Sequence, residues 1–479
     1  MELFFLYMLL LLVVYIFLFR KFFVYKQKSQ DASNGTHLPP GKMGWPIFGE
    51  TFEFVEAQRM GLLDKFIYDR KRSSSSDIFK TSLHGEPTAI FCGAAGNKFL
   101  FSTENDLVTA WWPTSVTKLF PSSLQASNIK DERIKLRKML PGFLKAEALQ
   151  RNVSVMDLMA KQHLETIWDT VKEVNVFPFA KNLTFSLSCQ LFLSITDPAQ
   201  VAKLFGLCSV VSAGIMAIPI NLPGMAFYRA IKASNLIRKE LYPIIKQRKI
   251  DIAENKMSSP THDMLSYMLL TSDDNGKFMN DLMISDRILT MILGGNITTS
   301  IVTTFILKYL AELPSIYSEV LREQTDIANS KTPGELLSWE DIRKMKYSWN
   351  VACEVMRLHS PIQGSFKEAA TDFTYSGFSI PKGWKLYWSA SATHMNPNYF
   401  PDPENFDPSR FEGSGPAAFT YIPFGGGSRM CPGNEFARAN ILTFMHNVVM
   451  KYKWEKVSTI NNHKPAPRGL DVRLRIHKY

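Results

Sequence analysis

One cysteine of this chain lies in a loop that contains four glycines, directly before a stretch with a helical pattern. The loop, Pro423–Gly433, reads PFGGGSRMCPG. Pro432 suits the first turn of a helix that begins after Cys431, so the thiol would lie at the positive end of the helix dipole. A tight surface turn, a structural half-cystine and an inert buried thiol are the simpler explanations.

The spacing of the cysteines argues against a disulfide. The other four are scattered along the chain without CxxC pairs, which excludes a disulfide framework and a zinc ribbon and fits a reducing compartment. They are Cys92, Cys189, Cys208 and Cys353. Cys431 therefore has no obvious disulfide partner.

The residues around Cys431 suit a thiolate that is bound to a metal. Backbone N–H groups of residues 425–427 and of Gly433 can approach the sulfur and tune a metal–thiolate bond. Arg429 can reach an acidic group on the rim of a cofactor, and Phe424 offers a flat face. A haem iron with cysteine as its proximal ligand needs this set of groups.

The loop resembles the haem loop of the cytochrome P-450 monooxygenases, whose pattern is F-x-x-G-x-R-x-C-x-G. The matching residues are Phe424, Gly427, Arg429, Cys431 and Gly433. The resemblance runs along nearly the whole chain and implies a cytochrome P-450 fold, mainly α with small β-sheets, behind an N-terminal transmembrane helix. It also implies haem as the cofactor, with Cys431 as the axial ligand of its iron and Arg429 and Phe424 as haem-binding residues.

A Glu-x-x-Arg motif supports the resemblance. Glu354 and Arg357 share one face of a helix that we predict to run from a cap at Ser338 to the residue before Pro361. An isolated pair of this kind is usually a surface salt bridge. Together with Arg410 in FDPSRF, the pair resembles the buried Glu-Arg-Arg cluster of the family, which implies a structural role and not a catalytic one.

The resemblance also assigns cations to the haem. Arg137 matches the propionate-binding arginine of the family, and Arg133, on the same predicted helical face, replaces the more usual Trp or His. Lys367 stands where relatives carry Arg. We expect all three to bind the cofactor.

Twenty residues without a charge, Ile288–Leu307, predict either a buried core helix or a second membrane span. Several threonines, Asn296 and the pair Gly294-Gly295 favour the core helix. Each glycine inside a helix costs about 1 kcal/mol relative to alanine, so the pair needs a reason such as close approach of a large planar group. The resemblance identifies this stretch as the helix over the haem, with Gly295 at the cofactor.

The oxygen-activating motif of that helix departs from the family at one position. The family pattern is Gly-Gly-x-Asp/Glu-Thr, whereas this chain has Asn296, Ile297 and Thr298 after the two glycines. The resemblance implies that Thr298 is catalytic, but isoleucine cannot relay protons as the acid does. We expect Thr298 and Asn296 to hold a water in its place, so that activity is weakened and not lost.

The chain opens with an uninterrupted apolar run, Leu3–Phe19, and cations follow it between residues 20 and 28. At about 1.5 Å per residue the run is just long enough to cross a bilayer core. A cleaved signal peptide would instead carry its cations before the run. The positive-inside rule places the part of the chain after residue 20 in the cytosol. We therefore predict a single-pass protein of the endoplasmic reticulum membrane, with an anchor and basic flank at 1–28, a linker and proline-rich hinge at 29–50, and a haem-binding catalytic domain at 51–479.

Surface features add two expectations. In a cytosolic domain the Asn-x-Ser/Thr sequons at Asn34, Asn152, Asn182 and Asn296 would be accidental. The net charge of +11 suits anionic lipid, an acidic protein partner or nucleic acid. No Lys/Arg run with interleaved aromatics and no nucleic-acid signature is visible, so we expect no nucleic-acid partner.

Longer motifs narrow the resemblance to one branch. LPPGKMGWPIFGE, WNVACEVMRLHSP and GFSIPKGWKLYWSA resemble the plant triterpenoid oxidases typified by β-amyrin 28-oxidase. This implies a pentacyclic triterpene of the β-amyrin type, oxidised at C-28 in successive steps. Dioxygen and electrons from NADPH, delivered by NADPH–cytochrome P-450 reductase, would drive the reaction. Ala110–Phe120 and Cys208–Ile220 are apolar enough either to line a roomy pocket or to pack in the core.

Three alternatives to this function stay open at the level of sequence. The chain could oxidise another position of a triterpenoid, or a diterpenoid. It could be a haem-thiolate isomerase or dehydratase, which needs no oxygen activation and which the isoleucine at position 297 favours. It could also be a haem binder without catalysis.

Overall fold

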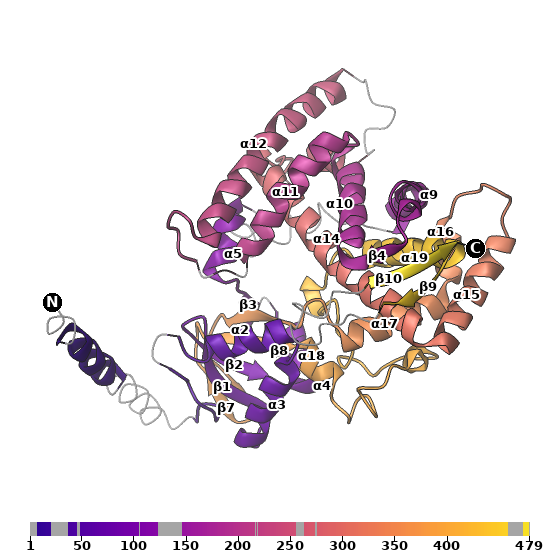
Figure 1. The fold of residues 1–479 in the computed structure, drawn as a ribbon. Helices are drawn as coiled ribbons and strands as arrows, with labels where there is room; N and C mark the ends of the chain where they lie inside the picture. The colour runs from indigo at the N-terminus through magenta and orange to yellow at the C-terminus, as the bar shows by residue number, and fades with distance from the viewer. Residues whose placement is uncertain are drawn as a thin grey trace.

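The computed structural model describes residues 7–20, 37–45, 48–104, 106–122, 146–215, 217, 219–254, 263–273, 275–457 and 473–478. Over these residues the fold is mainly helical with small sheets, as predicted. Figure 1 shows a sheet-rich part that contains β1, β2 and β8, and a larger helical part beside it.

The helices account for most of the described chain. They are Tyr7–Arg20 at the N-terminus, α2 (Thr51–Met60), α3 (Leu63–Ser74), α4 (Gly93–Ser102), α5 (Thr114–Leu119), α9 (Ala146–Thr166), α10 (Val176–Leu193), α11 (Pro198–Ile215), α12 (Ala226–Ala253), α13 (Met264–Leu270), α14 (Asp281–Glu312), α15 (Pro314–Asn329), α16 (Trp339–Lys344), α17 (Lys346–Leu358), α18 (Ala390–His394) and α19 (Asn434–Lys451), with 3-10 turns η1 (Trp168–Thr170), η2 (Pro408–Phe411) and η3 (Gly427–Arg429).

The largest sheet joins strands from both halves of the chain, in the order β1-β2-β8-β5-β3. Within it β2 and β8 are parallel and the other neighbours are antiparallel. Two smaller sheets have the order β4-β10-β9 and β6-β7. The strands are β1 (Ile78–Leu83), β2 (Glu86–Phe91), β3 (Val108–Ala110), β4 (Glu173–Asn175), β5 (Gly364–Ala369), β6 (Phe373–Tyr375), β7 (Phe378–Ile380), β8 (Lys385–Ser389), β9 (Tyr452–Lys456) and β10 (Arg473–Lys478).

α14 is a core helix, as predicted for Ile288–Leu307. The side chain of Asn280 caps its start by accepting a hydrogen bond from the N–H of Met283 at 2.9 Å. The helix contacts α10, α12, α17 and α19. Within its most apolar window 67% of the residues are buried, which matches a core helix and not a lipid-facing span.

α11 is the second helix of the described residues that is long and apolar enough to cross a membrane, but it lies along α12. A Cβ on Gly214 would come within 2.1 Å of the Cβ of Ala230, so glycine permits the close approach of the two helices. Cys208 and Val211 are buried in the main core. The start of the stretch 208–220 therefore packs in the core, whereas Ile220 is exposed. Phe120, at the end of the other predicted pocket stretch, is also buried in the core.

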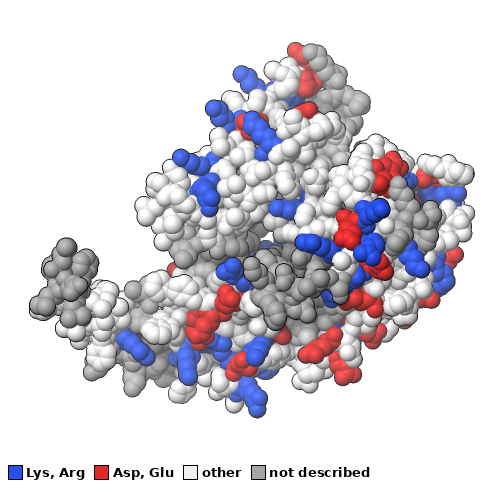
Figure 2. Space-filling view, viewed as in Figure 1, with Lys and Arg blue, Asp and Glu red and all other residues white. Residues whose placement is uncertain are grey.

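The N-terminal helix stands apart from the rest of the molecule (Figure 1), and its apolar side chains are exposed, as for Leu9, Val13 and Phe17. A helix with exposed apolar side chains all round suits lipid and not water. Figure 2 shows basic and acidic side chains together over the face in view and no single basic tract there. The predicted basic flank and linker lie mostly outside the described residues.

One predicted helix is wrong in extent. The capping box at Ser338 is present, with the N–H of Ser338 donating to Asp341 at 2.9 Å, but the chain leaves the helix at Met345. A new helix, α17, begins at the next residue. Its first-turn N–H groups at Tyr347 and Ser348 donate to the carboxylate of Glu323, at 2.7 and 2.9 Å. This acceptor on α15 lets a second helix start where the sequence pattern alone predicts continuity.

Candidate active site

The cysteine loop is fixed against α4 by contacts that only glycine permits. Gly427 has a φ of 68°, and a Cβ on it would lie 2.3 Å from the carbonyl oxygen of Phe101. A Cβ on Gly426 would lie 2.4 Å from the ring of the same phenylalanine. The N–H of Cys431 donates to the carbonyl oxygen of Phe424 at 2.9 Å. These contacts hold the thiol in one place.

α19 begins at Asn434, with Gly433 as its N-cap, so the prediction that a helix starts directly after Cys431 is wrong by two residues. The chain is still extended at Met430, with φ −51° and ψ 146°. Pro432 precedes the helix and does not form its first turn. The thiol thus lies just before the helix, where the dipole acts more weakly than within the first turn.

Cys431 differs from the other four cysteines in its surroundings. It is the one cysteine of the five that is partly exposed. Burial raises the pKa of each of the others to about 12. Burial also raises the pKa of Cys431, although a backbone hydrogen bond from Gly433 opposes this rise. A thiolate at this position therefore needs a positive partner such as a metal.

The donor set fits haem. Across the described residues there is no group of three or more His, Cys, Asp and Glu side chains that could hold a bare metal ion. One thiol is enough for an iron that a macrocycle already binds through its own nitrogens. Cys431 would hold that iron.

α14 leaves open space beside its glycine pair. A Cβ added to Gly294 or Gly295 would meet no atom within 4 Å outside the helix backbone. Thr298 lies one turn further on and donates from Oγ1 to the carbonyl oxygen of Gly294 at 2.6 Å. α14 also contacts α19, the helix that follows the cysteine loop. The pair therefore does not serve tight helix packing, which agrees with the predicted room for a planar group.

Neighbouring residues of the α14 motif point in different directions. Asn296 is buried, and its amide donates to the carbonyl oxygen of Lys181 at 2.7 Å and to Oγ1 of Thr184 at 2.8 Å, both on α10. Ile297 packs against the main core. The expectation that Asn296 holds a catalytic water is therefore wrong, because its side chain joins α14 to α10. Of the three residues after the glycines, Thr298 alone offers a hydroxyl beside the open space.

Two of the predicted haem-binding cations converge on one carboxylate. Nζ of Lys367 lies 2.7 Å and Nε of Arg429 lies 3.1 Å from Oε1 of Glu104. Burial lowers the pKa of Lys367, and the charge of Glu104 opposes this. Sequence reasoning missed Glu104. Glu104 and Asp106 both lie between the apolar segments FLF and LV, so the sequence did not single out Glu104.

Arg133 and Arg137 lie outside the described residues, so their haem-binding role stays a prediction. Phe424 is partly buried against the main core and supplies the backbone acceptor for Cys431.

The Glu354–Arg357–Arg410 cluster is present and joins three elements. Glu354 and Arg357 are fully buried, and two guanidinium nitrogens each lie 2.7 Å from a carboxylate oxygen. Nε of Arg410 lies 3.5 Å from the same carboxylate. Arg357 also donates to the carbonyl oxygen of His394 at 3.1 Å. The cluster connects α17, α18 and η2, which agrees with the predicted structural role.

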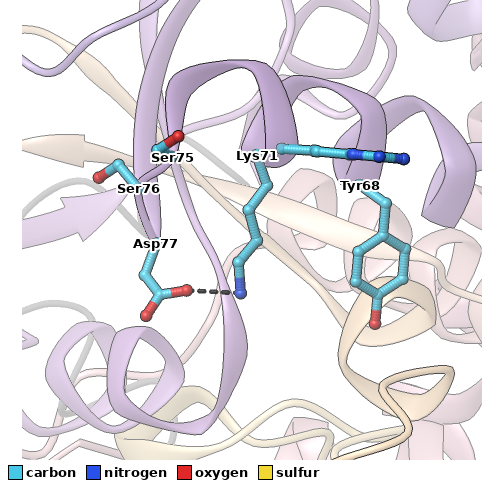
Figure 3. Close-up of a pocket in the computed structure, with 6 residues that line it drawn as sticks. Tyr68, Lys71, Ser75, Ser76 and Asp77 are labelled. Atoms are coloured by element: carbon cyan, nitrogen blue, oxygen red, sulfur yellow. Dashed lines mark ion pairs between the residues drawn. The ribbon is translucent and has the colours of Figure 1, made fainter.

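Two surface cavities lie away from these residues. Figure 3 shows the first, of about 350 Å³, between α3 and the start of β1, where Lys71 and Asp77 form an ion pair at 2.5 Å. The second, of about 410 Å³, is lined by Lys161 and Lys331, whose amines are already ion-paired. Neither cavity contains a predicted site residue.

The cytochrome P450 family model matches residues 39–475, which is nearly the whole chain after the apolar helix. The chain belongs to the cytochrome P450 family. It is thus a haem-thiolate monooxygenase that takes electrons from NADPH through a reductase, as the cysteine loop predicted.

Curated plant proteins are similar to the chain over nearly its full length. The chain is 57% identical over 480 residues to a "Beta-amyrin 28-monooxygenase" of Medicago truncatula, covering 99% of both chains. It is 57% identical over 483 residues to a protein of the same name from Vitis vinifera, covering 100% of both. "Cytochrome P450 716A1" of Arabidopsis thaliana is 53% identical over 447 residues, covering 91% of this chain and 92% of its own.

Solved structures confirm the predicted fold. The structure titled "Retinoic acid bound cyanobacterial CYP120A1" superposes with a TM-score of 0.81 at 29% identity and covers 93% of this chain and 100% of its own. CYP102L1 superposes with a TM-score of 0.76 at 18% identity, over 93% of this chain and 100% of its own, and supports the fold alone.

Replacing the thiol tests the iron ligand. Cys431→Ser should abolish the red-shifted absorption of the reduced carbon-monoxide complex, because that band requires a thiolate ligand. Single replacement of Cys353 or Cys189 by serine should leave the band in place. A normal band in Cys431→Ser would contradict the assignment.

Restoring an acid on α14 tests proton delivery. Ile297→Asp should raise the product formed per NADPH consumed, whereas Thr298→Ala should lower it below the wild-type value. A well-placed general acid is typically worth about 10²–10⁴-fold in rate, and the gain in product per NADPH is limited by full coupling. Because Ile297 packs against the core, the carboxylate should also reduce the yield of folded protein. Ile297→Val is the control. If the wild type already couples NADPH use tightly to product and Ile297→Asp gives no gain, proton delivery does not depend on this position.

Proposed function

We propose that this monooxygenase oxidises a pentacyclic triterpene of the β-amyrin type at C-28. The observation that carries the proposal is identity of 56–57% over nearly the full chain to relatives named for that reaction in several plants.

Different residues of the chain have different roles in this reaction. Haem, when bound, supplies the activation of dioxygen with two electrons from NADPH. Cys431 would hold the iron, and the open space at Gly294 and Gly295 would receive the cofactor. Thr298 holds a proton at Oγ1 beside that space. The balanced step converts a methyl group, O₂, NADPH and H⁺ into a primary alcohol, water and NADP⁺, and its repetition on the same carbon gives the aldehyde and the acid.

One observation alone would suit the alternative of a haem-thiolate isomerase or dehydratase, which the curated relatives do not support. Such an enzyme needs no proton relay to oxygen, and α14 carries an isoleucine in place of the acid while Asn296 is committed to α10. Against it stands the intact Thr298 and its position next to the glycine pair. Dependence of turnover on NADPH separates the two functions.

Product analysis tests the substrate. The full chain is expressed in yeast with a plant cytochrome P-450 reductase and a β-amyrin synthase, and the triterpenes are profiled by mass spectrometry and NMR. We expect β-amyrin oxidised at C-28, first as the alcohol and then as aldehyde and acid, and nothing from Cys431→Ser. A product oxidised at another carbon, a product that forms without the reductase, or no product at all would each contradict the proposal.

We propose in addition that the helix within residues 1–28 anchors the catalytic domain to the cytosolic face of the endoplasmic reticulum, next to the reductase. The exposed apolar helix and the cations that follow it support this orientation. Of the sequons on described residues, Asn152 and Asn296 are buried and Asn182 is exposed, so Asn182 reports on topology.

Removing the helix tests the anchor. Deletion of Met1 to Lys28 should give a protein that still binds haem but sediments less with membranes, because the apolar helix is the main lipid contact that we infer. The full-length protein should show no mobility shift after glycosidase treatment. Glycosylation at Asn182 would place the domain in the lumen and contradict the proposed orientation.

A further inference from the structure

We infer that Arg287 is a substrate-binding residue: its guanidinium donates hydrogen bonds to the hydroxyl group at the end of the triterpene that is far from the oxidised carbon. The inference rests on the proposed function and deepens it, because the group that it names is the 3-hydroxyl of a substrate of the β-amyrin type.

Arg287 is a buried cation in the first half of α14. It is 6% exposed. Among the residues that the structure describes, its Nε has no hydrogen-bond partner, and no acid offsets the effect of burial, which lowers the pKa of Arg287 to about 10. The guanidinium therefore stays protonated at neutral pH. A buried charge is costly unless a partner compensates it, so a ligand that supplies acceptor oxygen would bind here favourably.

The nearest acid along the chain is committed elsewhere. Oδ1 of Asp286 lies 2.6 Å from Nε of Arg238 on α12, and Oδ2 accepts a hydrogen bond from the N–H of Ser122 at 2.8 Å. Successive residues of an α-helix are turned by about 100°, so Asp286 and Arg287 leave α14 in different directions. Asp286 thus compensates the charge of Arg238 and not that of its neighbour in sequence.

Arg287 shares a face of α14 with the residues at the open space. Positions seven and eleven residues apart differ by only about 20° around a helix of 3.6 residues per turn, so Gly294 and Thr298 lie on this face. Met291, one turn after Arg287, is partly exposed and lies between the cation and the glycine pair. The face thus presents a cation, then an apolar side chain, then the space beside which Thr298 offers its hydroxyl.

This order of groups matches a flat molecule with one polar end. At 1.5 Å per residue Arg287 lies about 10 Å from Gly294 and about 16 Å from Thr298 along the helix axis, a distance that five fused six-membered rings can span. β-Amyrin carries its one hydroxyl on the first ring, whereas C-28 is attached where the last two rings join. With C-28 beside Thr298, the hydroxyl points toward Arg287. A hydroxyl oxygen has two acceptor lone pairs, which suit the donors of a guanidinium.

Binding of β-amyrin to the full-length, haem-loaded protein in detergent tests this contact. The spin-state change of the haem during titration gives the dissociation constant without turnover. Arg287→Met should weaken the binding of β-amyrin about 10- to 100-fold, as is usual for the loss of a hydrogen bond to a charged group. The analogue without the 3-hydroxyl should bind the wild type as weakly, and Arg287→Met should not distinguish the two ligands. Arg287→Lys should restore part of the preference, because it keeps N–H donors.

The stability of the ligand-free protein separates a binding role from a structural one. Arg287→Met removes a buried charge that no described acid compensates, so the melting temperature, followed by circular dichroism, should rise. Lys308→Met is the matched control: Lys308 is a cation of the same helix, but it pairs with Glu312 at 3.0 Å. This control should leave the affinity for both ligands unchanged.

Three results would overturn the inference. They are wild-type affinity for β-amyrin in Arg287→Met, a wild type that binds both ligands equally well, and a lower melting temperature of Arg287→Met, which includes its failure to accumulate as folded protein. If the wild type shows no spin-state change with β-amyrin, the proposed function fails. The melting temperature then decides the role of Arg287 by itself: a rise supports a binding cation, and a fall overturns it.

Discussion

The position of one sulfur atom decides what this molecule can do, and the protein fixes that position with its backbone. The N–H of Cys431 is bonded to the carbonyl oxygen of Phe424, while Gly426 and Gly427 lie against Phe101 at distances that no side chain would allow. The loop therefore has little freedom to move the thiol. α4 is coupled to Cys431 through these contacts, although it is distant from Cys431 in sequence.

Buried charges organise the space around this loop. One cluster, Glu354 with Arg357 and Arg410, connects α17, α18 and η2. A second cluster, Glu104 with Lys367 and Arg429, connects the end of α4, β5 and the cysteine loop. Buried ion pairs add little net stability, but a charge that finds its partner in only one arrangement favours that arrangement. In the first cluster Arg357 also donates to the backbone carbonyl of His394. The second joins the cysteine loop to β5.

The sequence predicted the fold class, the cysteine loop, the Glu-Arg-Arg cluster and the core position of α14, because each depends on residues close together in the chain or on a strong motif. It did not predict Glu104, whose partners lie 263 and 324 residues away. It also missed the break at Met345, because the acceptor that starts α17 is Glu323 on another helix. The predicted role of Asn296 was wrong for the same reason, because its hydrogen-bond partners are on α10. Tertiary hydrogen bonds of this kind leave no local pattern.

The side chains at 296, 297 and 298 leave α14 about 100° apart, since an α-helix has 3.6 residues per turn. Each of the three residues therefore has a separate contact. Asn296 bonds to α10, Ile297 packs against the core, and Thr298 offers a hydroxyl beside the open space at the glycine pair. An enzyme built in this way can change the efficiency with which it uses NADPH by substitutions at one position while the junction with α10 stays intact. A change at Thr298 can therefore alter the coupling of NADPH use to product formation while the hydrogen bonds of Asn296 to α10 stay in place.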